Sequence, residues 1–241
     1  ELDPFAGIFE QSQGLDEILH AIEVAKNDNR IKGISINNNF IIAGLAQTQA
    51  IRGALEDFRS NGKFIYAYAD FYMQRDYYLA SVADSIFMNP VGVLDFKGLS
   101  TEVLYFKELQ EKSGVKMEVI RHGKYKSAVE PYLENNMSEA NRSQLTSLLQ
   151  SLWNSMVTDI SNTRGISESD LNSIADTLGG RTPKYAKKSG LVDDITFYDE
   201  YENKLSNALA LKNEDKINIS TLDDYVKYSN KKTLKSGDDK I

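Results

Sequence analysis

Two lysines in a short segment, Lys124 and Lys126, are the side chains of this chain best suited to chemistry. They follow three apolar residues, Met117, Val119 and Ile120, and a glycine, Gly123. At such a strand-to-helix junction a lysine can pack its stem against apolar neighbours, and the loss of water disfavours its charged form. Burial can lower a lysine pKa by up to ~3–5 units from a reference of about 10.4. A lysine that is neutral near pH 7 can take the proton of a serine hydroxyl.

The residues after the lysines predict a short helix. Ser127 to Glu130 tolerate helical structure, and Pro131 is expected to stop them. Ser127 has two open roles, because its hydroxyl could orient a lysine amine or could cap the helix. Glu130 is expected to be structural, since a carboxylate close to Lys126 would raise the lysine pKa and defeat a base.

The order of residues around the lysines resembles the lysine motif of a known peptidase family. The segment is Gly123-Lys124-Tyr125-Lys126-Ser127-Ala128-Val129-Glu130-Pro131-Tyr132. It resembles the signal peptide peptidase A (protease IV) family, whose long form carries a G-x-Y-K-S-A-V-E-P-aromatic string. The resemblance assigns the catalytic lysine to Lys126 and leaves Lys124 as a solvated neighbour.

Further segments agree with this resemblance, which extends from Gly14 to Leu205. The residues from Asn61 to Ala69 are similar to the family's G-K-P-hydrophobic strand, and those from Tyr77 to Asp84 to its Y-Y-L-A-S-x-A-D helix. The residues from Ala186 to Asp193 are similar to the A-x-x-x-G-L-V-D segment near the end of each repeat. A resemblance spread over several segments indicates a shared fold as well as a shared motif.

The nucleophile that short members of the family place in an S-G-G-Y-Y window is missing. Here the window is Gln74-Arg75-Asp76-Tyr77-Tyr78, with no serine and no glycine pair. In long members the N-terminal repeat supplies the lysine and a C-terminal repeat supplies the serine. The resemblance therefore implies that residues 1–226 form a lysine-bearing N-terminal repeat. The polar, lysine-rich residues 227–241 are expected to form a linker toward a second repeat.

The resemblance implies one half of a Ser/Lys-dyad serine endopeptidase that degrades signal peptides after their cleavage. Lys126 would be the base, the serine would lie in the C-terminal repeat of the same protein, and this chain alone would be inactive. The substrates would be apolar peptides. Members of the family form tetramers, so the resemblance also implies a homo-oligomer, a tetramer. A membrane anchor upstream of Glu1, in a bacterial cell envelope, is also implied, whereas this chain itself is expected to be soluble.

Gly44 is a further candidate for a substrate-binding or orienting role. It follows the loop from Asn37 to Ala43, where catalytic repeats of this fold place backbone amides that hold an oxyanion. Because the same repeat holds no nucleophile, an ordinary structural glycine is the stronger interpretation. The histidines, His20 and His122, are expected to stand outside the dyad.

Composition argues against several other classes of protein. A net charge of −7 and a pI near 5.0 argue against binding to nucleic acid, which requires a basic surface. The chain has no cysteine and only two histidines, which excludes disulfides and argues against a structural zinc site. No cofactor and no metal are implied. No apolar run approaches the ~18–20 residues that are needed to span a bilayer.

Alternating helix and strand patterns indicate an α/β domain with mostly parallel strands. Helices are expected at residues 15–27, 51–62 and 77–79, and strands at 31–36, 64–69 and 85–88, the last ended by Pro90. An apolar stripe from Leu145 to Ile160 predicts a long amphipathic helix, and Ser167 to Asp170 has capping-box spacing for the next one. The resemblance narrows the fold class to a crotonase/Clp-protease-like spiral of ββα units with a helical extension.

Two other functional classes stay open. The repeat could be a non-catalytic oligomerisation and substrate-chamber module, in which case Lys126 would be dispensable. A crotonase-like acyl-CoA enzyme shares the fold class, but it would need paired oxyanion glycines near Gly44 and a carboxylate or water-activating pair. The sequence shows neither clearly, and thermal stabilisation by acyl-CoA would favour that class.

Overall fold

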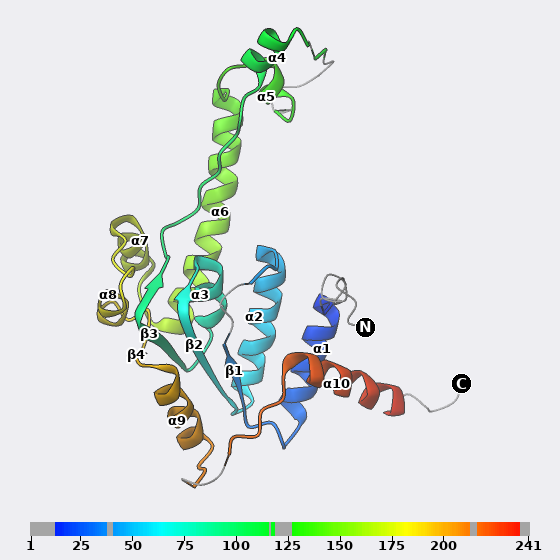
Figure 1. Ribbon diagram of the computed structural model, residues 1–241, viewed down its shortest axis with the longest axis vertical. Helices are drawn as coiled ribbons and strands as arrows, with labels where there is room; N and C mark the ends of the chain where they lie inside the picture. The colour runs from blue at the N-terminus through cyan, green and yellow to red at the C-terminus, as the bar shows by residue number, and fades with distance from the viewer. Residues whose placement is uncertain (1–12, 38–40, 116, 119–126, 213–215, 237–241) are drawn as a thin grey trace, which may run out of the picture.

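The computed structural model describes residues 13–37, 41–115, 117–118, 127–212 and 216–236. A parallel four-stranded sheet forms the body, with helices packed on both of its faces, and one long helix extends away from it (Figure 1). The predicted α/β fold class with a helical extension, of the crotonase/Clp-protease type, is confirmed.

The sheet has the order β1-β2-β3-β4, and every neighbouring pair is parallel. The strands are β1 (Gly33–Ile36), β2 (Phe64–Tyr72), β3 (Ser85–Leu94) and β4 (Asp194–Ile195). The helices are α1 (Leu15–Asn27), α2 (Leu45–Ser60), α3 (Gln74–Ala80), α4 (Lys107–Ser113), α5 (Glu130–Leu133), α6 (Glu139–Arg164), α7 (Glu168–Thr177), α8 (Pro183–Lys188), α9 (Tyr198–Ala208) and α10 (Leu222–Ser236). Helices α2 and α3 are the crossovers that parallel neighbours require. The helices and strands predicted before Pro90 all occur, with longer bounds for several of them.

The side chains of β2 alternate between two helical layers. Ile65 and Ala67 belong to the main core with residues of α1, α2 and α6, whereas Tyr68 belongs to a second cluster with Tyr201 of α9. The rings of Tyr68 and Tyr201 stack with their centroids 5.0 Å apart. Successive side chains of a strand point to opposite faces, which produces this division. The strand is buried because helices cover both faces of the sheet.

Strand β3 continues past Pro90, where the sequence predicted its end. Its pairing with β2 moves from Ala69–Met88 to Phe71–Val93, so the ladder is irregular between these two pairs. A proline is tolerated there because an irregular ladder does not require its missing N–H. Gly92 lies in the same stretch, and a Cβ on it would come within 2.3 Å of the backbone oxygen of Asp70. The prediction failed because it assumed a regular ladder.

Helix α6 carries an arm that projects from the body. In Figure 1 its N-terminal half runs outward, with α4 and α5 at the far end. The predicted apolar stripe divides along it, because Trp153 and Ile160 are buried in the core while Leu148 is 54% exposed. The pattern predicted the helix correctly, but only the C-terminal half of the helix buries that pattern in the body.

A buried polar cluster holds the root of this arm. The Arg52 side chain of α2 donates from Nη2 to the backbone oxygen of Asp159, at 2.9 Å, and to Thr163 Oγ1, at 2.8 Å. Its guanidinium lies 5.4 Å from the centroid of the Tyr78 ring. The Tyr78 hydroxyl donates to the Asp159 carboxylate at 2.5 Å, and burial raises the tyrosine pKa, so the hydroxyl keeps its proton. The cluster ties α2 and α3 to α6.

The C-terminal segment is helical as far as Ser236, whereas the sequence predicted an irregular linker from residue 227. Helix α10 packs against α1, with Val226 and Ser229 buried. The buried carboxylate of Asp28 accepts hydrogen bonds from Arg30 and from the Tyr225 hydroxyl. The sequence predicted a linker because the segment is polar. Polar contacts with α1 and with the turn that follows α1 hold it as a helix instead. That the segment leads toward a second repeat stays a prediction.

Candidate functional site

The predicted base lies in a part of the chain that the structure leaves undescribed. Lys126, Lys124 and His122 all fall outside the described residues. Ser127 is described, and its carbonyl accepts the N–H of Glu130 at 2.9 Å in the turn before α5. The N-cap of α5 is Val129, without a side-chain capping bond, so Ser127 does not cap this helix. The orienting role of Ser127 stays a prediction.

Pro131 lies in the first turn of α5 instead of stopping a helix, so that prediction was wrong. The proline occupies the first turn of α5, which covers Glu130–Leu133. In the first turn a missing N–H breaks no hydrogen bond, and the fixed φ of proline suits a helix start. Of the residues that were expected to be helical, Ser127 to Val129 precede α5 and only Glu130 belongs to it.

Glu130 anchors the tip of the arm. Its buried carboxylate accepts hydrogen bonds from Ser138 Oγ at 2.6 Å, from the Ser138 N–H at 3.3 Å and from Asn141 Nδ2 at 3.1 Å. Ser138 is itself the N-cap of α6 and accepts the Asn141 N–H. These contacts join α5 to the start of α6. The geometry agrees with the structural role that was expected of Glu130.

Three consecutive residues at the start of α3 hold the loops at the carboxyl end of the sheet. The Asp76 carboxylate accepts the N–H of Ile41 at 2.8 Å, and Arg75 Nη1 donates to the carbonyl of Ala43 at 2.7 Å. Gln74 binds the segment that follows β3. Ligands of parallel α/β sheets bind beyond the carboxyl ends of the strands. This end of the body is therefore the candidate site that the described residues build.

Asp76 is the least solvated member of this group. Burial raises the pKa of its carboxyl, and the hydrogen bonds from the N–H groups of Ile41 and Met73 oppose that rise without cancelling it. In the sequence, residues 74–76 stood out only for the serine that they lack. A run of three polar residues just past the end of a buried strand, separated from it by Met73, was the signal that these side chains could bind crossing loops.

Gly44 also lies at this end, as the N-cap of α2. Its N–H donates to Gln47 Oε1 at 2.8 Å and its carbonyl accepts the Thr48 N–H at 2.9 Å, so both groups serve the start of the helix. Its φ of −64° is open to any residue. An oxyanion role would require the bond to Gln47 to be exchanged for one to a ligand, and that role stays a prediction.

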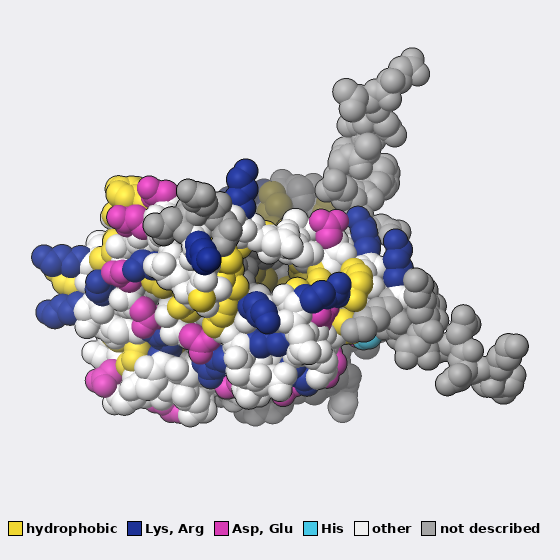
Figure 2. All heavy atoms as spheres, turned by 90° about the horizontal axis from the view of Figure 1, so that it is seen from below, with side chains coloured by type: hydrophobic (Ala, Val, Ile, Leu, Met, Phe, Trp, Pro, Cys, Tyr) yellow, Lys and Arg dark blue, Asp and Glu magenta, His cyan; other side chains and the backbone are white. Residues whose placement is uncertain are grey.

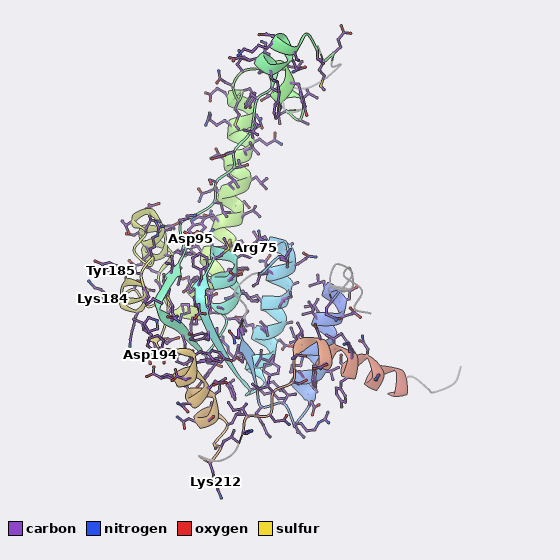
Figure 3. All side chains as sticks on the ribbon, in the orientation of Figure 1. Arg75, Asp95, Lys184, Tyr185, Asp194 and Lys212 are labelled. Carbon is purple, nitrogen blue, oxygen red and sulfur yellow. The ribbon has the colours of Figure 1, made fainter. Side chains whose placement is uncertain are left out.

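The structure keeps the predicted site residues apart. Gly44 belongs to the body, at the N-terminus of α2, while Ser127 belongs to the turn before α5, at the far end of the arm (Figure 1). The N-terminal half of α6 lies between them. In Figure 3, Arg75 and Asp95 lie where the arm leaves the body. The described residues thus form two separate regions, the strand ends and the arm tip.

The described part of the chain shows no group of three or more His, Cys, Asp or Glu side chains that could hold a metal ion. Within the same residues, no helix combines the length and the apolar character needed to cross a membrane. Figure 2 shows the face of the body opposite the arm, where basic and acidic side chains are interspersed with apolar ones. That face therefore presents charges of both signs.

Comparison with known proteins identifies relatives. The sequence profile of peptidase family S49 matches residues 57–212. "Protease 4" of Haemophilus influenzae is 37% identical over 218 residues, which cover 87% of this chain and 35% of the relative. "Protease 4" of Salmonella typhi is 38% identical over 204 residues, or 81% of this chain and 33% of the relative. "Serine protease SPPA, chloroplastic" of Arabidopsis thaliana is 27% identical over 227 residues, or 94% of this chain and 33% of the relative.

The chain spans about a third of the length of these curated relatives. The profile match covers more than half of the chain and includes β2, α3, β3, the whole arm and α9. Both regions of interest, the strand ends at Gln74–Asp76 and the arm tip at Ser127, lie inside it. The chain therefore belongs to peptidase family S49, the family of signal peptide peptidase A (protease IV).

Proposed function

We propose that this chain is the lysine-bearing N-terminal repeat of a Ser/Lys-dyad endopeptidase that degrades cleaved signal peptides. The observation that supports it is the distance along the arm between its tip and the strand ends of the body. The lysine motif runs directly into Ser127 at that tip. A serine that reacts close to Ser127, the sequence neighbour of Lys126, would come from another repeat or another copy. This chain alone would then be inactive.

In this mechanism Lys126 is neutral before the reaction and acts as the general base. It takes the proton of a serine of the C-terminal repeat, and the serine oxygen attacks the scissile carbonyl of the peptide. Backbone N–H groups hold the developing oxyanion. The protonated lysine then gives its proton to the leaving amine. An apolar peptide in extended form would be held by main-chain hydrogen bonds, with side-chain pockets giving preference.

Exposed apolar residues on the arm support a homo-oligomer, which the family resemblance makes a tetramer. Leu104 is 70% exposed, Leu109 62% and Leu148 54%. Exposed large apolar side chains can mark a site of interaction with another protein. We propose that another copy or the second repeat covers them. In the full-length protein, a segment that precedes this chain would anchor the assembly in the bacterial cell envelope.

The same exposed residues favour an alternative, in which the repeat only builds the assembly and lines a substrate chamber. The two functions differ in what they require of Lys126. The base is essential in the first and dispensable in the second.

The test measures peptidase activity on an apolar fluorogenic peptide. It compares the natural longer protein with its Lys126→Ala variant, with Lys124→Ala as the matched control, and with this chain alone. We expect Lys126→Ala to lower kcat by about 10²–10⁴-fold or more, the range for a general base. Lys124→Ala should keep most of the activity, and this chain should be silent. Full activity of Lys126→Ala would contradict the proposal. The alternative function, a module for assembly and the substrate chamber, would then stand.

A further inference from the structure

The Gln74 side chain makes three hydrogen bonds to the backbone of two consecutive residues. Its Oε1 accepts the N–H of Lys97 and the N–H of Gly98, each at 2.9 Å, and its Nε2 donates to the Gly98 carbonyl at 2.8 Å. A residue of an extended peptide exchanges the same donor and acceptor with its partner in an antiparallel ladder. The carboxamide of Gln74 therefore occupies the place of a peptide residue opposite Gly98.

Both sides of this contact are held by the fold. Gln74 is the first residue of α3 and is separated from the end of β2 by Met73 alone, and residues 97–98 follow β3. The two strands stay paired up to the contact, since the Asp95 N–H donates to the Tyr72 carbonyl at 2.8 Å. Gly98 has a φ of +91°, in the region that favours glycine. This backbone turns two successive N–H groups toward one oxygen, an arrangement that binds carbonyl or anionic oxygens.

The third hydrogen bond decides which ligands would fit. Two convergent N–H groups alone would accept a carboxylate as well as an amide oxygen. The Gly98 carbonyl faces the same group, and it would repel a carboxylate oxygen at the position of Nε2. A ligand that offers one acceptor and one donor side by side satisfies all three backbone groups. The contact therefore selects an amide over an anion.

We propose that the backbone of Lys97 and Gly98 is a binding site for the N–H and C=O of one residue of an extended peptide, or for a primary carboxamide, and that Gln74 fills this site from within the chain. The strand ends of this repeat are then closed to extended peptides by its own glutamine. That the competing ligand is a peptide rests on the proposed function, whereas the occupied site rests on the three hydrogen bonds.

Gln74→Ala opens the site with little disturbance to its surroundings. Alanine suits the first turn of a helix. The capping contacts of Asp76 with the backbone of Met73 and Ile41 do not involve Gln74. Gln110 provides a matched control, since its carboxamide also pairs with backbone groups, donating to the Tyr132 carbonyl at 2.8 Å and accepting the Met117 N–H at 3.0 Å. Gln110→Ala removes a comparable amide but leaves Gln74 in place.

The test follows the amide signals of Lys97 and Gly98 by NMR in the full chain, labelled selectively with ¹⁵N-lysine and ¹⁵N-glycine. The probes are acetamide, acetate and a short apolar peptide with an amidated C-terminus. In Gln74→Ala we expect saturable shifts of both signals with acetamide, weaker ones with acetate, and peptide binding about tenfold or more tighter than in the unsubstituted chain. The unsubstituted chain and Gln110→Ala should show no saturable shift of these two signals.

Equal shifts in the unsubstituted chain, or none in Gln74→Ala, would overturn the proposal. If Gln74→Ala does not fold, Gln74→Glu tests the proposal instead. Glutamate keeps the shape of the side chain but replaces the Nε2 donor with an oxygen acceptor. The Gly98 signal of Gln74→Glu should then be displaced at neutral pH and return toward its usual position as the glutamate is protonated, and an unmoved signal would refute the site. No readout depends on peptidase activity, so this result and that of the Lys126 test stand apart.

Discussion

At the scale of single residues, Glu130 and Gln74 show how one polar side chain can organise backbone that would otherwise lack partners. Glu130 binds the N-cap residue of α6 and the Asn141 amide, and Gln74 binds three backbone groups after β3. A buried polar group without its partner destabilises a fold more than the bond itself stabilises it. Each of these side chains is therefore hard to replace by one with different donors and acceptors.

Glu130→Gln should loosen the arm tip without unfolding the body. The amide is neutral, so its oxygen accepts weaker hydrogen bonds than the carboxylate, and an Nε2 in place of Oε1 leaves the proton of the Ser138 hydroxyl without its acceptor. We expect a local loss on the order of 1–3 kcal/mol, seen as faster hydrogen exchange in α5 and the first turns of α6. Glu134→Gln, at an exposed neighbour, is the control. Equal protection in both variants would show that Glu130 does not hold the tip.

At the scale of elements, α10 shows how polar contacts can help to hold a helix of mostly polar composition in place. The hydrogen bonds of the Arg30 side chain, with help from the Arg30 N–H and the Tyr225 hydroxyl, hold the pKa of Asp28 well below its usual range against the effect of burial. Arg30 Nη2 also donates to the Tyr228 hydroxyl at 2.5 Å. Asp28 and Arg30 follow α1, and both tyrosines belong to α10. One ion pair thus connects elements from the two ends of the chain.

Acid should release α10 before it unfolds the sheet. Because the pKa of folded Asp28 is lowered, its contribution is fully present above the ordinary value of 3.8 and is lost as the pH falls toward the folded value. We expect α10 to lose hydrogen-exchange protection below about pH 4. Asp28→Asn should show weak protection of α10 already at neutral pH, and little further loss in acid. Asp223→Asn, an exposed change on α10, should behave like the unsubstituted chain, and an acid response that survives in Asp28→Asn would assign the effect to another group.

At the scale of the whole molecule, the chain divides into a body with a closed core and an arm whose outer described residues belong to neither core cluster. The core takes up the C-terminal half of α6, and the polar cluster around Arg52 fixes its direction. Apolar residues of the arm are left exposed in this chain. Contact with another polypeptide would bury this apolar surface, as in the proposed oligomer.

Charged residues on the arm should therefore weaken the assembly. Leu104→Asp combined with Leu109→Asp places two carboxylates on the surface proposed to be covered, and burying them there would be unfavourable. We expect the natural longer protein to lose its oligomer, as a fall in mass by light scattering after size-exclusion chromatography. Phe197→Asp, at a residue of the body that is 54% exposed, is the control and should keep the mass. An unchanged mass in the arm variant would place the interface elsewhere.

Patterns within a few positions of the chain were enough to predict many of the elements. The stripe from Leu145 to Ile160 predicted α6, and Ser167 does accept the Asp170 N–H as the N-cap of α7. Such features depend on neighbours along the chain, so spacing alone reveals them. The ordered motif around Lys126 likewise predicted the family, because its residue order identifies relatives whatever its conformation.

The sequence by itself determined the fold class, the main helices and strands, and membership of the peptidase family. Only the tertiary structure decided that Pro90 lies inside β3, that α10 docks on α1, and that Gln74 fills the backbone site at Gly98. Tyr225 and Asp28 are 197 positions apart, and Gln74 and Gly98 are 24 apart. Spacing along a chain reports which neighbours a residue can reach locally. Which distant groups meet depends on how strands pair and helices dock, and that is settled only when the core is packed.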